Sequence, residues 1–292
     1  MKNKLTYVRL GILLILIISS SNVFSQNALL WKISDADNRN SYLYGTIHLK
    51  DERVFAYADT VIGCMKMCDK VVLELDLNPM NLLQYSNMLF LTGDSTLKDF
   101  FNGKDYDTIV NTVEKTTGMQ FSFFERFKPV ALLSVVMENI LPGDMETTLD
   151  EFFYKKGIQM HKEIVGLETF DEQFKILESI PMESVIDFLK HPEKTISDLD
   201  PMICDYLNTK LNELLRLMQE DETMANLKKE FLDERNIKMA AKIDSLFKNN
   251  TLTIAVGAGH LPGEKGLINL LKKKGYKLTP IVLEVPADMK CD

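Results

Sequence analysis

The chain has 292 residues, of which 46% are hydrophobic and 26% charged, and its formal net charge is −8. An acidic protein with no stripe of lysine and arginine lacks the positive surface that nucleic acids require, so nucleic-acid binding is excluded as a class. Four cysteines are too few for a disulfide-rich scaffold, and a chain of this length can bury its own core.

Residues 1–25 have the pattern of a secretory signal peptide. The segment opens with three basic residues, Lys2, Lys4 and Arg9. Leu10–Ile18 is an apolar core too short to span a bilayer, and Val23 and Ser25 are small enough to permit cleavage before Gln26. Cleavage removes three positive and no negative charges, so the net charge changes from −8 to −11. We expect an exported protein, periplasmic or secreted, without a membrane span after signal removal.

Residues 26–292 are expected to form a single α/β domain. Strand-like segments occur at both ends of this region, and helical segments fill the middle. We expect a central, mostly parallel sheet made from two pseudo-symmetric β-α-β halves. A large helical insertion, at roughly residues 79–248, separates the two halves.

The first half begins with two short strands around a polar turn, Leu29–Ile33 and Ser41–Thr46. A helix over Asp51–Cys68 and a strand over Lys70–Leu77 are predicted next. This β-α-β order is typical of a parallel sheet that is covered on both faces. Glu74 lies near the carboxyl end of its strand, where open α/β sheets bind ligands, so we predict a functional role for it.

The insertion is predicted to be mainly helical and to form a cap over the sheet edge. Its helices are expected at Met80–Phe90, Tyr106–Thr117, Pro129–Leu141, Leu149–Lys156, Thr169–Leu177 and Glu183–Leu189. Lys162–Leu167 is the one strand candidate, and it ends at Glu168. A long helical pair over Ile196–Lys248, broken near Glu220–Glu222, completes the insertion.

The last helix of the insertion carries an arginine on its apolar side. The apolar positions, at three- and four-residue steps, are Met224, Leu227, Phe231, Met239, Ile243 and Leu246. Arg235 falls on this stripe, and Asn236 follows Leu232 by one turn. A guanidinium on a buried helix face is costly unless it is paired. The alternative is that Arg235 reaches out to solvent and Asn236 is exposed. We favour a role in the site for both residues.

A strand followed by Gly-x-x-His occurs twice, once near each end of the mature chain. Ser41–Thr46 runs into a motif that ends at His48, and Thr251–Val256 runs into a motif that ends at His260. Each histidine therefore emerges at the carboxyl end of a strand. If both belong to one site, the strands ending at Thr46 and Val256 must be parallel and adjacent, or nearly adjacent.

A helix and then a strand are predicted after the second motif, as they are after the first. A helix over Glu264–Lys274 and a strand over Tyr276–Val285 follow His260. Glu284 then has an offset from its histidine similar to that of Glu74. We interpret the two halves as an internal pseudo-repeat.

The candidate residues are chemically suited to a divalent metal. Histidine and glutamate are common ligands of such ions, so His48, Glu74 and His260 are the predicted metal ligands. With an open position, the ion would lower the pKa of a bound water enough for it to attack an amide or ester. Glu74 or a neighbour would be the base, and Arg235 and Asn236 would orient a carboxylate or stabilise an oxyanion. Zinc is one divalent ion that is compatible with these ligands.

The remaining cysteines and histidines have simpler interpretations. Cys64 and Cys68 lie one turn apart on a predicted helix. They could bind a metal, but we favour two small apolar side chains on a buried helix face. His161 and His191 are expected to be solvated.

Taken together, these segments resemble the TraB/GumN family, which includes the Tiki metalloproteases and lies near the erythromycin-esterase-like and ChaN-like proteins. The matching pieces are LWKIS…SYLYGTIHL, VVLELDL, KPV…LD…GLETFDEQ, LDERNIKMAAKI and VGAGHLPGEKGLINLLKKKGY. The resemblance implies an α/β fold with two pseudo-symmetric halves. It also implies that one site is lined by His48, Glu74, Arg235 and His260. For the Tiki branch it implies metal-dependent peptide cleavage, with manganese or cobalt favoured.

The leading hypothesis is an exported metal-dependent hydrolase, a metalloprotease-like peptidase, with a peptide or small-molecule substrate. The alternative is a non-catalytic protein of the cell envelope that binds haem, a metal or a peptide, which the ChaN-like relatives motivate. A third hypothesis is an interaction protein whose helical cap masks a partner.

Overall fold

A computed structural model describes residues 27–80, 85–141, 143–197, 199–213, 232–289 and 291. The predicted signal peptide lies outside these ranges, as do Met224, Leu227 and Phe231 of the predicted apolar stripe and part of the predicted helix Met80–Phe90. Within the described ranges, no helix combines the length and the apolar character needed to cross a bilayer.

The centre of the protein is a mixed, mostly parallel six-stranded sheet. Its strands are β1 (Leu30–Ser34), β2 (Asn40–Thr46), β3 (Lys70–Leu75), β4 (Glu163–Glu168), β5 (Leu252–Gly257) and β6 (Lys277–Ile281). They are arranged in the order β4-β3-β5-β2-β1-β6. The four strands from β4 to β2 run parallel, and β1 is antiparallel to both of its neighbours. The predicted α/β class and mostly parallel sheet are confirmed.

The two strands that carry the Gly-x-x-His motifs are parallel neighbours, as predicted. β2 pairs with β5 from Tyr42 opposite Thr253 to Thr46 opposite Gly257, so both strands end at the same sheet edge. β5 also pairs with β3, which brings the end of β3 to this edge. Leu252–Val256 is buried throughout, as expected for a strand covered on both faces.

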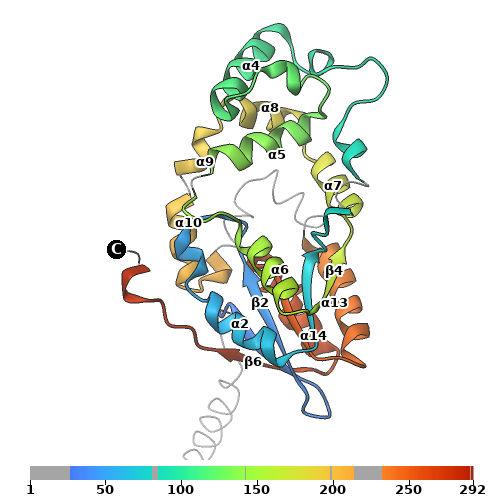
Figure 1. The fold of residues 1–292 in the computed structure, drawn as a ribbon, viewed down its shortest axis with the longest axis vertical. Coiled ribbons are helices and arrows are strands. Elements are labelled where there is room, and N and C mark those ends of the chain that lie inside the picture. The colour runs from blue at the N-terminus through green and yellow to red at the C-terminus, as the bar shows by residue number, and fades with distance from the viewer. Residues whose placement is uncertain are drawn as a thin grey trace, which may run out of the picture.

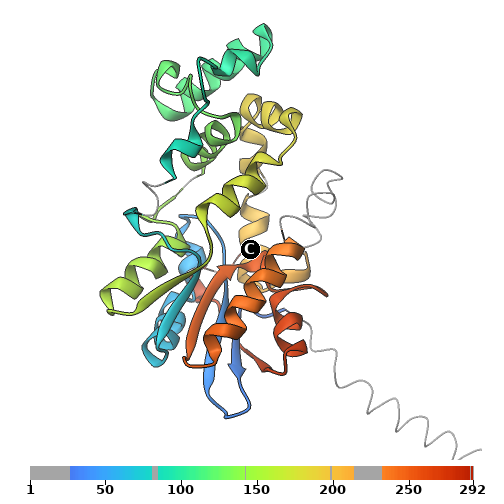
Figure 2. The same cartoon turned by 90° about the vertical axis from the view of Figure 1, so that its right-hand side faces the viewer.

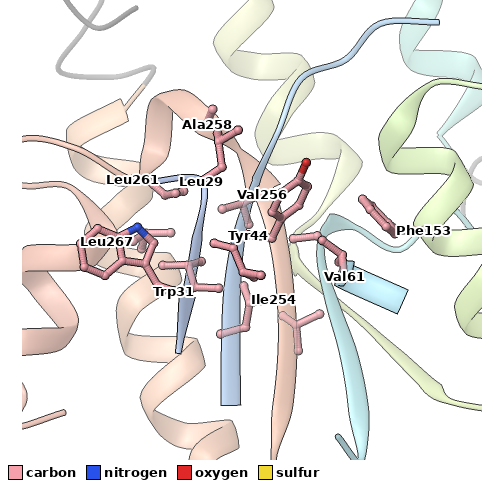
Figure 3. Close-up of a cluster of buried hydrophobic side chains, with 14 of the residues drawn as sticks. Leu29, Trp31, Tyr44, Val61, Phe153, Ile254, Val256, Ala258, Leu261 and Leu267 are labelled. Atoms are coloured by element: carbon pink, nitrogen blue, oxygen red, sulfur yellow. The ribbon is translucent and has the colours of Figure 1, made fainter. Parts of the chain in front are cut away.

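Helices cover both faces of the sheet. One face packs against α2 (Ala58–Met67) and α6 (Leu149–Gln159), and the other against α13 (Glu234–Phe247) and α14 (Leu267–Lys273). Figure 3 shows Trp31 and Leu267 on one side of the strands and Tyr44, Val61 and Phe153 on the other. Each of these five side chains is almost completely buried, so the main core has a layer on each face.

The helices and the strand of the predicted insertion pack on two separate hydrophobic cores. Four helices, α4 (Gly103–Thr117), α5 (Pro129–Ile140), α7 (Phe170–Glu178) and α8 (Met182–Lys190), contribute to a second core. Figures 1 and 2 show α4, α5 and α8 gathered at one end of the molecule, away from the sheet. By contrast, α6, β4 and α10 (Leu199–Leu207) pack on the main core. The short helix α9 (Glu193–Ser197) lies between α8 and α10 in the chain.

Several single-turn 3-10 helices complete the described secondary structure. They are η2 (Glu52–Phe55), η3 (Ser86–Leu89), η4 (Leu97–Asp99), η5 (Phe121–Phe123), η7 (Ala258–His260) and η8 (Ala287–Met289). The first of them interrupts the predicted helix Asp51–Cys68. The Asp51 side chain accepts the Arg53 backbone N–H and caps this turn, so the α-helix begins only at Ala58.

The end of the chain differs from the prediction. The closing strand stops at Ile281, because its partner β1 ends its pairing there, opposite Leu30. Glu284 lies beyond the strand, is exposed, and lines a pocket with Cys291, which is disulfide-bonded to Cys204. Glu284 is therefore not the counterpart of Glu74. Cys64 and Cys68 are buried, as predicted, and the structure shows both as free thiols.

Candidate active site

A cavity of about 290 Å³ lies at the carboxyl ends of β2, β3 and β5. It is lined by Thr46, His48, Leu73, Glu74, Leu75, Leu77, Asp150, Gln173 and Gly257. Open α/β sheets bind ligands at this position, so the cavity occupies the crevice expected from the sequence. Two of the residues singled out from the sequence, His48 and Glu74, line its wall.

Both carboxylate oxygens of Glu74 are held by hydrogen bonds. Oε1 accepts the backbone N–H of Gly257 at 2.6 Å. Oε2 accepts from the guanidinium of Arg235 at 3.0 Å and from the amide of Gln173 at 3.1 Å. The first contact depends on a glycine, because a Cβ at position 257 would lie 3.0 Å from Oε1. In the second motif, the glycine thus permits close approach of the carboxylate.

Arg235 is paired, as the cost of burying a guanidinium requires. Its side chain is 14% exposed, and it donates to both oxygens of the Glu168 carboxylate. Nε lies 2.8 Å from Oε1 and 3.1 Å from Oε2, and Nη2 lies 2.6 Å from Oε2. Burial alone would lower the pKa of Arg235, but the hydrogen bond to Glu168 and the charges of Glu74 and Glu168 raise it overall. Arg235 therefore joins the ends of β3 and β4 as a permanent cation.

His260 is buried behind this network with a defined orientation. Its Nδ1 lies 2.6 Å from the amide oxygen of Asn236, which is also buried. An amide oxygen only accepts, so Nδ1 carries the proton and Nε2 keeps its lone pair. Burial lowers the pKa of His260, which favours this neutral form. Nε2 lies 3.5 Å from Oε1 of Glu74.

His48 has a different environment on the same cavity wall. Its side chain is 70% exposed, and Nδ1 lies 3.2 Å from Oδ2 of Asp150. The other oxygen of Asp150 accepts the Thr46 hydroxyl at 2.5 Å. The hydrogen bond that His48 donates to the Asp150 carboxylate raises the pKa of His48.

Four of the five predicted site residues are joined by hydrogen bonds or close contacts, and the fifth, His48, faces the same cavity without joining them. Glu74, Arg235, Asn236 and His260 form one hydrogen-bonded network, and His48 faces the cavity that Glu74 lines. In the part of the chain that is described, no three His, Cys, Asp or Glu side chains are grouped so that they could hold a metal ion. The assignment of His48, Glu74 and His260 as metal ligands stays a prediction, as do the catalytic roles of Glu74, Arg235 and Asn236.

Four polar residues of the site did not emerge as candidates from the sequence: Thr46, Asp150, Glu168 and Gln173. Glu168 ends β4 beside Leu75 of the parallel strand β3, so its position at a strand end was the available signal. Asp150 lies in the first turn of α6, where acidic residues are common for electrostatic reasons alone. Neither pattern distinguishes a site residue from an ordinary one.

Comparisons with known proteins identify the family of the chain. Residues 29–280 match the TraB/PrgY/GumN family, and the chain belongs to that family. It is similar to a "Metalloprotease TIKI homolog" of Amphimedon queenslandica, at 24% identity over 88% of this chain and 62% of the relative. Similar matches are the "Metalloprotease TIKI2" proteins of Danio rerio, at 21% identity over 82% and 58%, and of Xenopus tropicalis, at 21% over 86% and 59%.

The chain spans about three fifths of the length of these relatives. The similarity to TIKI metalloproteases is therefore distant and partial. No solved structure matches the chain significantly.

Proposed function

We propose that this protein is an exported metal-dependent hydrolase that cleaves peptide bonds. The observation that carries the proposal is the pair formed by Nε2 of His260 and Oε1 of Glu74, 3.5 Å apart beside the cavity at the carboxyl ends of the parallel strands. Membership of the TraB/PrgY/GumN family and distant similarity to TIKI metalloproteases support the reaction class.

The residues fit a divalent cation. With Nδ1 bound to Asn236, Nε2 of neutral His260 is an acceptor, and so is the carboxylate oxygen that it faces. Two acceptors in this arrangement favour a cation between them. Two ligands with bonds of roughly 2.0–2.2 Å in a tetrahedral shell lie about 3.4 Å apart, close to the observed separation. His260 and Glu74 would hold the ion, with His48 as the predicted third ligand.

The bound ion would supply an activated water and polarise the substrate carbonyl. The chain's own residues prepare the site for this chemistry. Arg235 and Gln173 hold one oxygen of Glu74, and Asn236 holds one nitrogen of His260, so both ligand atoms are oriented before the ion binds. The apolar side chains of Leu73, Leu75 and Leu77 give the cavity a surface suited to apolar parts of a substrate.

Two observations support export. The first 25 residues have the signal-peptide pattern described above. Cys204 and Cys291 form a disulfide, and such bonds persist in oxidising compartments outside the cytosol. N-terminal sequencing of protein from the cell envelope tests this part, with Gln26 expected as the first residue. A retained 1–25 segment would contradict it.

The activity is tested with metal-stripped protein, reconstituted separately with manganese, cobalt or zinc and incubated with a peptide library read by mass spectrometry. We expect cleavage only after metal addition, and a loss of at least about 100-fold in Glu74→Gln and His260→Gln. Glu284→Gln is the matched control, because this glutamate is exposed and lines a different pocket, together with Cys291. Full cleavage in the presence of a chelator would contradict the proposal. Tight metal binding without cleavage of peptides or esters would favour the binding-protein alternative.

A further inference from the structure

Asp150 is a charged residue of the cavity that the proposed function leaves without a role. It is the second residue of α6, directly after Leu149 and the N-cap Thr148. The N-terminal end of a helix carries a partial positive charge, which suits an acidic side chain at this position. Its side chain is 24% exposed and reaches from α6 to the end of β2.

Each oxygen of Asp150 has its own partner. The Thr46 hydroxyl donates to Oδ1 at 2.5 Å, and Oδ2 faces Nδ1 of His48 at 3.2 Å. The Thr46 contact fixes the rotation of the carboxylate, which aims its second oxygen at the imidazole. A carboxylate only accepts hydrogen bonds, so Nδ1 of His48 must carry the proton. The Nε2 lone pair of His48 then remains available.

This arrangement matters because the His48 side chain is 70% exposed and, among the described residues, hydrogen-bonds only to Asp150. An exposed neutral imidazole in water favours the opposite tautomer, with the proton on Nε2. The partner of one ring nitrogen decides which tautomer is present and how the ring is oriented. Without Asp150, the tautomer with the proton on Nε2 would be favoured, and in that form Nε2 can act neither as a base nor as a ligand.

The packing of α6 does not depend on this carboxylate. Leu149 and Phe153 are completely buried in the main core, and the Leu149 backbone N–H donates to Leu49 at 3.2 Å. These contacts hold the start of α6 against the loop that carries His48. Removing the carboxylate should therefore leave the helix in place.

We propose that Asp150 is a positioning residue that holds His48 as the Nδ1–H tautomer and presents Nε2 to the cavity, with Thr46 fixing the carboxylate. The catalytic consequence of this arrangement rests on the proposed function. The tautomer itself does not, because it is a property of the metal-free protein.

The tautomer is measured by long-range proton–nitrogen correlation spectra of metal-free protein with ¹⁵N-labelled histidine, at a pH at which His48 is neutral. The chain has four histidines, and the His48→Gln spectrum identifies the signals of His48. We expect the Nδ1–H pattern in the wild type and a shift to Nε2–H in Asp150→Ala. Glu151→Gln is the matched control, because Glu151 is the next residue of α6 and pairs with the exposed Lys155.

Two results would overturn the proposal: an Nε2–H pattern in the wild type, or an Nδ1–H pattern that persists in Asp150→Ala. If Asp150→Ala fails to fold, Thr46→Val takes its place, because this variant keeps the Asp150 charge but frees the carboxylate to rotate. We then expect a mixture of the two His48 tautomers. An unchanged Nδ1–H pattern in Thr46→Val would count against the proposal. In the peptidase assay, kcat of Asp150→Ala should fall about 10- to 100-fold with little change in KM. If no cleavage is found for any variant, the proposed function fails while the tautomer result still stands.

Discussion

Oε1 of Glu74 and Nε2 of His260 face each other at 3.5 Å although both atoms are hydrogen-bond acceptors. Each is fixed from its far side, Glu74 by Arg235 and Gln173 and His260 by Asn236. Oε1 also accepts the Gly257 backbone N–H at 2.6 Å, so the two lone pairs are held at a separation that suits a shared cation. This preorganisation underlies the predictions below.

Arg235→Met should be strongly destabilising. The substitution leaves the buried carboxylate of Glu168 without its cation and weakens the hold on Glu74. Breaking a buried ion pair in this way costs about 3–5 kcal/mol of unfolding free energy. Urea denaturation measures the loss. Lys238→Met on the same helix is the control, because its pair with Glu172 is exposed and should cost less than about 1 kcal/mol. Equal losses in the two variants would show that the Arg235 pair does not stabilise the fold.

Asn236→Leu should uncouple His260 from its partner at nearly constant volume. The buried Nδ1–H then lacks an acceptor, which costs about 1–3 kcal/mol of stability. Loss of this orienting contact should also lower metal affinity about 10- to 100-fold in calorimetric titrations. Asn269→Leu removes a side-chain hydrogen bond, to the Gly263 carbonyl, that involves none of the site residues. It should lower stability without changing metal affinity, and a change of affinity in both variants would contradict this prediction.

The stability of the metal-free protein should fall in mild acid because of His260. Burial lowers the pKa of this imidazole from its ordinary 6.5, so the unfolded chain binds a proton before the folded protein does. The resulting loss of unfolding free energy is absent above about pH 6.5. It grows as the pH falls below this value, by at most about 1.4 kcal/mol per pH unit. His260→Gln keeps His48 and should show a smaller slope of unfolding free energy against pH. Identical slopes would contradict the buried neutral state.

The fold and part of the site could be predicted because their signals are local. Alternating and continuous apolar runs indicated the strands, and Arg235 was identified because a charge fell on an apolar helical stripe. Asp150 and Glu168 were not, because their burial depends on the path of the insertion, which no local pattern encodes. Glu284 matched Glu74 in spacing but lies beyond the last strand pair. Spacing alone cannot reveal where a strand loses its partner.

Removing the disulfide should destabilise the protein without disturbing the site directly. The bond between Cys204 and Cys291 closes a loop with a sequence separation of 87, and the chain-entropy treatment gives a stabilisation of about 4–5 kcal/mol for a loop of that size. Double substitution of both cysteines by serine should lower the melting temperature by a corresponding amount. A reducing agent should have the same effect on the wild type and none on the double variant. Insensitivity of the wild type to reduction would contradict the prediction.

The most direct test of the metal-dependent site is anomalous X-ray diffraction from crystals grown with manganese, recorded on both sides of the manganese absorption edge. The account predicts an anomalous peak at about 2.0–2.2 Å from both Nε2 of His260 and Oε1 of Glu74. A manganese ion bound only elsewhere on the molecule would contradict it. So would crystals of catalytically active protein with no anomalous peak between these two atoms.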